Sequence, residues 1–283
     1  MSHLNFASDL VVGLDPVRFA RVAGIEPDDW QARLLRSTAP RILLNVTRQG
    51  GKSSTVGLLA CHTVLYEPGA LVLVLSPSER QSKELFRRIL ATYRMLGRPV
   101  PGTAENALSL ELENGSRVVA LPGKEGTIRG YSGVRLLIID EAAKVADDLY
   151  RAVRPMLAVS GGRLAVLSTP FGRRGFFYDC YQDRANWEYY EVPATACPRI
   201  PAAFLAEEQR AMGALWYASE YLCEFVENIN SVFTYADVMG AFTSDVAPLF
   251  APAESVAAAV GPITPAVRPL FALEAPPAEE FRL

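Results

Sequence analysis

The sequence predicts an α/β fold in which a mostly parallel sheet is flanked by helices, with a small helical region after the sheet. Two observations support this prediction. Between residues 41 and 192, apolar segments of strand length alternate with segments of helical spacing, as in a parallel sheet with crossover helices. The strand segments are almost continuously apolar, which is typical of strands buried on both faces: residues 42–46, 71–75, 134–140 and 164–167.

The clearest helix signal follows the second of these segments. Ser78 followed by Gln81 is a capping-box start, and Gly97 is a stop signal. An apolar face lies between them, at Leu85, Phe86, Ile89, Leu90, Tyr93 and Leu96. The other face is basic, with Arg80, Lys83, Arg87, Arg88 and Arg94. Such a face is either solvated or contacts nucleic acid, and the sequence favours the solvated face.

A hairpin is predicted between the second and third strand segments. Residues 108–112 and 117–121 flank the dipeptide Asn114-Gly115, whose residues tolerate the positive φ angles of a tight turn.

Beyond residue 192 the pattern becomes helical, over residues 202–212 and 215–225. From residue 243 onward Ala and Pro dominate without a sustained period, and acidic residues outnumber basic ones. We therefore expect three regions: a core over residues 1–195, a helical lid over 196–242, and a poorly ordered acidic tail over 243–283.

Composition excludes several classes of protein. The chain has 283 residues, a formal net charge of −3, and only 4 Cys and 2 His. The cysteines lack CxxC spacing, which argues against a structural zinc site. The apolar runs fall far short of the roughly 20 residues that a membrane span requires. The N-terminus lacks the basic and apolar segments of a secretory signal, so we expect a cytoplasmic protein without a membrane partner.

A phosphate-binding loop follows the first strand, with the sequence Arg48-Gln49-Gly50-Gly51-Lys52-Ser53 before a helix. The usual pattern GxxxxGK[ST] has glycine first, where this chain has Val46. The physical requirements survive this change. Gly50 and Gly51 let backbone N–H groups approach phosphate oxygens, Lys52 can reach the outer phosphates, and the Ser53 hydroxyl can ligate Mg²⁺.

Two further strand ends supply candidate catalytic groups. Asp140 and Glu141 end the third strand segment, so Asp140 would hold Mg²⁺ through water and Glu141 would orient and deprotonate the attacking water. Ser168 and Thr169 end the fourth, where small hydroxyl groups could sense the γ-phosphate. Upstream, the amide of Gln31 could make a two-point hydrogen bond to adenine.

Together, Trp30-Gln31, the phosphate loop, Asp140-Glu141 and Ser168-Thr169-Pro170 resemble the ATPase domain of the large terminase subunit of tailed bacteriophages. The resemblance covers about residues 25–242. It extends to residues 127–130 before the acidic strand, and to Glu224-Phe225 and Val232-Phe233 near the end of the domain. It implies a P-loop NTPase fold of the RecA-like (ASCE) type.

This resemblance implies an ATP-driven motor that moves double-stranded DNA into a procapsid, with ATP and Mg²⁺ as cofactors. Gln31 matches the adenine-contacting position, Arg48 the arginine inside the phosphate loop, and Ser168-Thr169 the coupling motif. Arg48 could offset charge that develops in phosphoryl transfer, or one of Arg129, Arg173 and Arg174 could reach a neighbour's site.

The implied partners are the portal, the small terminase subunit and further copies of the chain in a ring, in the cytoplasm of an infected bacterial host. A near-neutral net charge is compatible with a DNA partner, because a translocating motor must release DNA in every cycle.

Large terminases normally continue into an RNase H-like nuclease domain. Residues 243–283 offer only scattered carboxylates in a proline-broken segment, whereas a two-metal nuclease needs several on a packed sheet. We therefore expect no DNA cleavage by this polypeptide.

Two other functions remain open. A superfamily 2 helicase uses the same motifs but needs a second RecA-like domain, for which residues 243–283 leave no room. A non-hydrolysing nucleotide-binding assembly protein would retain the fold as a scaffold.

Overall fold

The computed structural model describes residues 6–121, 130–226 and 240. The chain divides into two units, Met1–Thr234 and Tyr235–Leu283. Everything below concerns the first unit, and the predicted tail lies outside the described residues.

The first unit is built on an eight-stranded sheet with the strand order β3-β4-β5-β2-β6-β7-β1-β8. The four predicted apolar strands are confirmed as neighbours in its centre: β1 (Arg41–Val46), β2 (Leu71–Leu75), β6 (Val134–Asp140) and β7 (Arg163–Ser168). The pairs β2–β6, β6–β7 and β7–β1 are all parallel. The predicted mostly parallel sheet is therefore confirmed.

The predicted hairpin is also confirmed, and it extends the central sheet. β4 (Ser109–Leu112) and β5 (Arg117–Leu121) are antiparallel, while β5 pairs in parallel with β2. Gly115 in the turn has φ +79°, which a glycine adopts without steric cost. The pattern did not predict the two outermost strands, β3 (Gly102–Glu105) and β8 (Glu188–Val192). β3 is exposed along its whole length and β8 is only partly buried, so neither carries a continuous apolar run.

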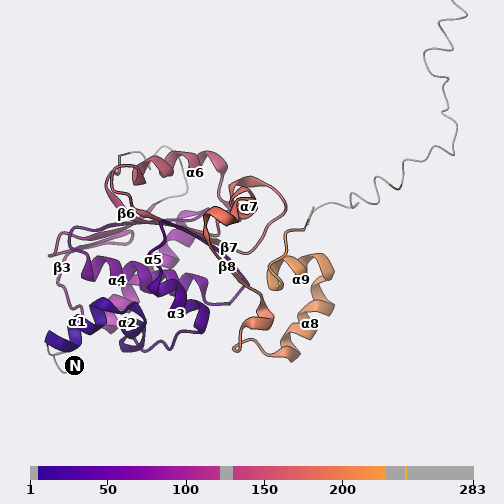
Figure 1. Ribbon diagram of the computed structural model, residues 1–283, viewed down its shortest axis with the longest axis horizontal. Coiled ribbons are helices and arrows are strands. Elements are labelled where there is room, and N and C mark those ends of the chain that lie inside the picture. Colours follow the sequence, from indigo (N-terminus) through magenta and orange to yellow (C-terminus); the bar gives the residue numbers. More distant parts are fainter. Residues whose placement is uncertain (1–5, 122–129, 227–239, 241–283) are drawn as a thin grey trace, which may run out of the picture. The chain divides into compact units, whose positions relative to one another are not determined.

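Helices cover both faces of the sheet (Figure 1). One face packs against α1 (Phe6–Leu14), α2 (Pro16–Val22), α3 (Asp29–Arg36), α4 (Lys52–Tyr66) and α5 (Glu79–Met95). The other face packs against η2 (Ala142–Lys144), α6 (Asp147–Val153), η3 (Arg154–Leu157) and α7 (Gly175–Gln182). Each face of the sheet has its own hydrophobic core, and alternate strand residues point into one or the other. Leu136 and Ile138 belong to the first core, and Leu137 and Ile139 to the second.

Helix α5 confirms its predicted cap and its apolar face. The Ser78 hydroxyl accepts a hydrogen bond from the Gln81 amide, and the predicted apolar residues from Leu85 to Tyr93 are buried. Its basic face is paired with carboxylates, in Lys83–Glu79, Arg87–Glu84, Arg88–Glu84 and Arg94–Glu105. This pairing favours the solvated face over a nucleic-acid contact.

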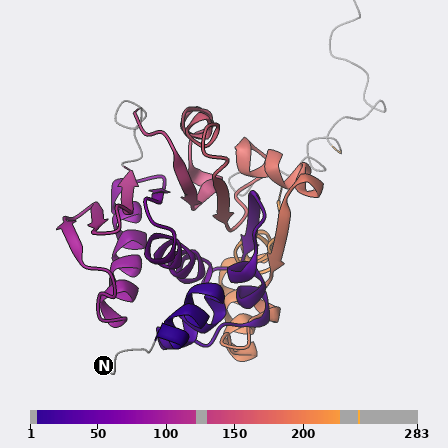
Figure 2. The same ribbon diagram turned by 60° about the vertical axis from the view of Figure 1, so that its left-hand side comes forward.

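The helical region after the sheet contains η4 (Arg184–Asn186), η5 (Ala194–Ala196), α8 (Ala202–Met212) and α9 (Ala214–Tyr221). A small core of its own joins Ala194, Leu205, Tyr217 and Tyr221. The prediction that the second helix runs to residue 225 is wrong, because Cys223 has φ +62°, which is incompatible with continuing the helix. β3 pairs antiparallel with β4, so β3, β4 and β5 form one antiparallel segment, the β3–β5 hairpin. Helices α8 and α9 lie at the β8 end of the sheet, far from this hairpin (Figures 1 and 2).

No helix among the described residues is long and apolar enough to cross a bilayer.

Candidate nucleotide site at the carboxyl edge of the sheet

Three neighbouring parallel strands, β1, β7 and β6, end at the same edge of the sheet. Asn45 of β1 pairs with Ser168 of β7, and Leu167 of β7 pairs with Asp140 of β6. The phosphate loop, the acidic pair and Ser168-Thr169, which are far apart in the sequence, therefore meet at one edge. This is the edge at which open α/β sheets bind ligands.

The phosphate loop between β1 and α4 has a shape that depends on its two glycines. Gly51 is the N-cap of α4 with φ +96°, a conformation that favours glycine. A Cβ atom on Gly51 would lie 2.6 Å from the Gln31 side-chain nitrogen. A Cβ atom on Gly50 would lie 2.7 Å from the Val46 side chain. Val46, which replaces the usual first glycine, thus packs directly against Gly50 of the loop. The backbone amides at the end of the loop form the N-terminus of α4, which is suited to phosphate binding.

Lys52, Ser53, Asp140 and Glu141 converge next to this loop. The Ser53 hydroxyl donates a hydrogen bond to Asp140 Oδ2 at 3.0 Å. Lys52 Nζ lies 3.7 Å from Glu141 Oε1. Lys52 and Asp140 are only 6% and 7% exposed. The four residues that the sequence assigned to phosphate, metal and water chemistry are thus in mutual contact.

The environment of Asp140 is unfavourable for its charge. Burial raises the pKa of its carboxyl above the ordinary value, and the nearby Glu141 carboxylate raises it further. Lys52 and the Ser53 hydroxyl act in the opposite direction. A bound cation would relieve this destabilisation.

Glu141 has a strained backbone, with φ +51° and ψ +40°. Its amide donates a hydrogen bond to Asp140 Oδ1 at 2.9 Å, which helps to hold that conformation. This left-handed conformation turns the chain at the end of β6, and the Glu141 carboxylate lies next to Lys52.

The residues present fit a magnesium ion bound together with a nucleotide. A serine hydroxyl and a carboxylate are hard oxygen ligands of the kind Mg²⁺ prefers. No group of three or more His, Cys, Asp or Glu side chains that could hold a metal occurs in the described part of the chain. The ion would therefore need phosphate and water oxygens to complete its coordination, as is usual for Mg²⁺.

Gln31 is buried, and its side chain lies against Gly51 of the phosphate loop. Its side-chain oxygen accepts a hydrogen bond from the Asp28 amide, and its nitrogen donates one to the Thr55 hydroxyl, both at 2.9 Å. Gln31 therefore connects the start of α3 to the first turn of α4. Its predicted contact with adenine stays a prediction.

Helix α9 holds two of the loops at this edge, which the sequence did not predict. The Glu220 carbonyl accepts hydrogen bonds from the Arg48 amide and the Thr47 hydroxyl, each at 3.1 Å. The Ser219 hydroxyl donates to the Pro170 carbonyl at 2.7 Å. Two adjacent α9 residues thus contact the phosphate loop and the loop after β7.

The arginine candidates differ in their surroundings. The Arg48 side chain is 62% exposed, and its guanidinium lies 3.8 Å from the Glu220 carboxylate. Arg173 Nε donates to the Phe225 carbonyl. Arg174 is exposed at the start of α7. Arg129 lies outside the described residues.

Several buried hydroxyl and amide groups at this edge have no hydrogen-bond partner within the described residues. They include the Ser168 hydroxyl, the side-chain oxygen of Asn45 and the hydroxyl of Ser76, which directly follows β2. No sequence pattern pointed to Ser76. It directly follows Leu75, which pairs with Ile139, so Ser76 lies at the end of β2 next to the end of β6, where Asp140 is.

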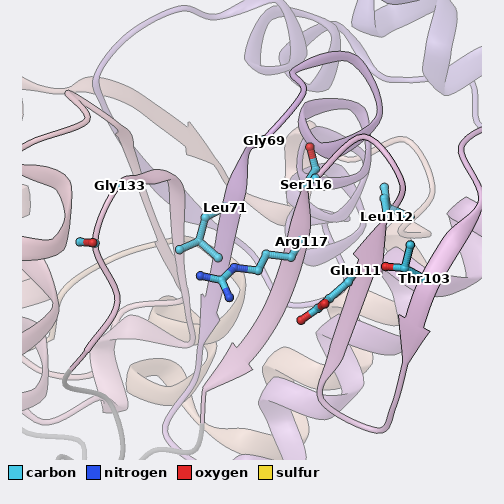
Figure 3. A pocket seen from close by; sticks show the side chains of 10 residues that line it. Gly69, Leu71, Thr103, Glu111, Leu112, Ser116, Arg117 and Gly133 are labelled. Carbon is cyan, nitrogen blue, oxygen red and sulfur yellow. The ribbon is translucent and has the colours of Figure 1, made fainter.

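A separate cavity of about 480 Å³ lies at the opposite end of β2 and β5, beside the hairpin (Figure 3). It is lined by residues that include Gly69, Leu71, Glu111 and Arg117. Since β2 and β5 begin there, this cavity is not part of the phosphate-loop site.

Comparison with known proteins identifies relatives of this chain. Residues 43–238 match the family model described as "Terminase large subunit, T4likevirus-type, N-terminal". A terminase large subunit of Thermus virus P23-45 is 25% identical over 259 residues, covering 78% of this chain and 53% of the relative. A probable terminase large subunit of Enterobacteria phage P7 is 26% identical over 143 residues, covering 46% of this chain and 29% of the relative. The chain thus spans about half the length of the Thermus relative.

Solved structures share the fold. The large terminase ATPase domain of Thermus phage P74-26 superposes with a TM-score of 0.67 at 21% identity, covering 74% of this chain and 98% of that domain. The HK97 bacteriophage large terminase gives a TM-score of 0.59 at 16% identity, covering 74% of this chain and 55% of that protein. The large terminase of a thermophilic bacteriophage, solved in complex with ADP, gives 0.58 at 14% identity, covering 70% of this chain and 53% of that protein. The predicted RecA-like fold is confirmed.

Proposed function

Since the chain belongs to the family of T4likevirus-type terminase large subunits, we propose that it is an ATP-hydrolysing motor subunit that moves double-stranded DNA into a viral procapsid. One observation carries the proposal. Lys52 and Ser53 at the start of α4 contact Glu141 and Asp140 at the end of β6, at 3.7 and 3.0 Å respectively, beside a glycine-dependent phosphate loop. The thermophilic bacteriophage terminase was solved with ADP and with ATP-gamma-S, which supports a nucleotide at the corresponding place in this fold.

In this proposal the phosphates of ATP are bound by the amides that begin α4 and by Lys52. Ser53 and Asp140 hold Mg²⁺, which supplies positive charge to the transferred phosphoryl group. Lys52 now lies 3.7 Å from Glu141. When Lys52 contacts phosphate instead, the Glu141 carboxylate becomes available to orient a water molecule and accept its proton.

The remaining assignments follow from position. Arg48, exposed on the phosphate loop, offsets charge developing on the γ-phosphate. Gln31 contacts adenine, and Gly50 and Gly51 shape the loop. Ser168 and Thr169 couple hydrolysis to movement, because their loop and the phosphate loop are both bonded to α9.

We further propose that residues 1–195 form the ATPase core and residues 196–242 a lid, and that the chain works as a homo-oligomeric ring. Its partners are double-stranded DNA, the portal of the procapsid and the small terminase subunit, in the cytoplasm of the infected host. The expectation that this polypeptide does not cleave DNA stays a prediction.

Phosphate release from ATP tests the proposal, measured with the full chain, Mg²⁺ and double-stranded DNA. We expect turnover by the wild type and a loss of about 10²–10⁴-fold in Glu141→Gln, which removes the base but keeps the shape. Glu141→Gln should still bind a fluorescent ATP analogue. Glu111→Gln, an exposed glutamate on the hairpin, is the matched control and should retain turnover. An inactive wild type that binds nucleotide would favour the scaffold function instead.

A further inference from the structure

Two cations gather around one aromatic ring close to the candidate site. Lys144 Nζ lies 5.5 Å from the centroid of the Phe171 ring, and the Arg174 guanidinium carbon lies 5.8 Å from the same centroid. Both distances are within the range of a cation–π contact. Lys144 and Arg174 are exposed, and Phe171 is half-buried.

The two cations come from the two loops that carry the candidate catalytic groups. Lys144 ends η2, three residues after Glu141. Phe171 and Arg174 lie in the loop between β7 and α7, directly after Ser168-Thr169-Pro170. A ligand bound to this cluster would therefore act on both loops at once.

The cluster has excess positive charge. Within the described chain, neither Lys144 nor Arg174 forms an ion pair, unlike most cations on α5. The acidic side chains nearest in sequence to Lys144 have other contacts. Glu141 lies 3.7 Å from Lys52, and Asp148 pairs with Arg151 at 3.1 Å. Asp147 accepts a hydrogen bond from the Phe176 amide at 2.8 Å, at the start of α7. Two like charges beside one ring, neither of them in an ion pair among the described residues, favour the approach of an anion.

We propose that Lys144, Phe171 and Arg174 form a contact site for the phosphate backbone of double-stranded DNA, built on the loops that follow Glu141 and Thr169. This inference rests on the proposed function, which makes DNA the polyanion available to the protein. A lysine and an arginine on separate loops suit a repeating line of phosphates, whereas a single γ-phosphate of a neighbouring subunit requires only one inserted arginine. Contact with DNA at this place would link its movement to the loops around the γ-phosphate.

The test is fluorescence anisotropy of a labelled DNA duplex of mixed sequence, titrated with the full chain at several salt concentrations. Lys144→Gln and Arg174→Gln should each weaken binding and lower the slope of log K against log salt by about 1, and the double variant by about 2. Lys144→Arg should keep the wild-type slope, because it keeps the charge.

The control is Arg184→Gln. Arg184 also lies over an aromatic ring, 4.6 Å from the centroid of Tyr181, but on η4 rather than on a loop of the site. We expect it to bind DNA as the wild type does. Thermal melting of each variant checks that the fold is intact.

Two results would overturn the proposal. One is a double variant with the affinity and salt slope of the wild type. The other is a double variant that binds DNA normally but loses ATP turnover in the absence of DNA, which would place the cations at a neighbour's nucleotide. The anisotropy needs no hydrolysis, so failure of the proposed function would appear separately, as a wild type without turnover.

Discussion

The carboxyl edge of β1, β6 and β7 and the β3–β5 hairpin belong to one sheet but differ in whether their buried polar groups have hydrogen-bond partners. In the hairpin, buried Ser116 is fully bonded: its hydroxyl donates to the Glu67 carbonyl and accepts from the Ala70 amide. At the carboxyl edge, the hydroxyls of Ser76 and Ser168 are equally buried and have no partner within the described residues.

Charge shows the same contrast, whereas positive φ angles occur in both regions: at Gln49 and Glu141 beside the candidate nucleotide site, and at Arg98 just before β3. At the carboxyl edge, Asp140 is a carboxylate buried next to another carboxylate. In the hairpin region, Glu105 is paired with Arg94 and Arg98. Unsatisfied polar groups and destabilised buried charges are costly, and they persist where a ligand completes them. The difference therefore marks the carboxyl edge as the part of the sheet shaped for binding, and the hairpin as the part shaped for stability.

The largest predicted effect is on activity at the carboxyl edge. Lys52→Ala removes the buried cation that lies between the phosphate loop and Glu141, so we expect ATP turnover to fall by about 100-fold or more. Lys83→Ala, which removes a half-buried lysine paired with Glu79 on α5, is the control and should keep turnover. Phosphate release measures both. Equal turnover in the two variants would show that Lys52 does not take part in ATP hydrolysis.

Two glycines with positive φ compare the regions directly. Gly51 in the phosphate loop has φ +96°, and Gly69 beside the hairpin has φ +77°. A Cβ on Gly69 meets nothing within 4 Å, so Gly69→Ala should cost only the backbone penalty, about 1–2 kcal/mol. Gly51→Ala adds a contact of 2.6 Å with Gln31 and should lower the free energy of unfolding further, with loss of nucleotide binding. Urea unfolding measures the difference, and equal losses would mean that the Gln31 side chain moves aside freely.

The glycine comparison also shows what the sequence could predict. The phosphate loop, the acidic pair and the central strands are local patterns, in which strongly apolar strands end in short polar motifs. Their meeting at one edge follows from the parallel sheet alone. The contacts of Ser219 and Glu220 with the loops of this edge join residues 49 and 173 positions apart, and no periodicity signals them. Edge strand β8 was missed because its partial burial gives no apolar run.

The capping role of Gln31 did have a signal. Asp28 followed three residues later by Gln31 is a capping pattern at the start of a helix. The sequence predicts an adenine contact for the same amide, whose oxygen accepts a hydrogen bond from the Asp28 amide and whose nitrogen donates one to the Thr55 hydroxyl. An amide offers two donors and two acceptor sites, so the positioning role and an adenine contact are compatible.

Removing a hydroxyl should have different effects in the two regions. Ser116→Ala removes two hydrogen bonds, although the Glu67 carbonyl and the Ala70 amide stay bonded to each other, so we expect it to lower the free energy of unfolding by about 1–2 kcal/mol. Ser168→Ala removes a group without a partner and should change stability by no more than about 0.5 kcal/mol, while reducing ATP turnover. Urea unfolding and phosphate release, measured on both variants, test this. A large loss of stability in Ser168→Ala would show that its hydroxyl is already bonded.

The smallest predicted effect is a gain of stability at Asp140. Burial and the Glu141 charge raise the pKa of this carboxyl above 3.8, so the folded state binds its proton more tightly than the unfolded state does. As pH rises from 3.8 through the raised folded value, stability is therefore lost, and at neutral pH the full penalty is present. Asp140→Asn removes the penalty, so its melting temperature without Mg²⁺ should exceed that of the wild type by a few degrees at pH 7. This difference should shrink as the pH falls toward 3.8.

A matched variant separates this effect from a general loss of charge. Asp148 on α6 is exposed and paired with Arg151, so Asp148→Asn should leave the melting temperature nearly unchanged at both pH values. If Asp140→Asn melts below the wild type at pH 7, the hydrogen bonds from Ser53 and the Glu141 amide outweigh the buried charge. If instead Asp140→Asn melts at a higher temperature but no longer hydrolyses ATP, then Asp140 lowers the stability of the protein but is needed for its function.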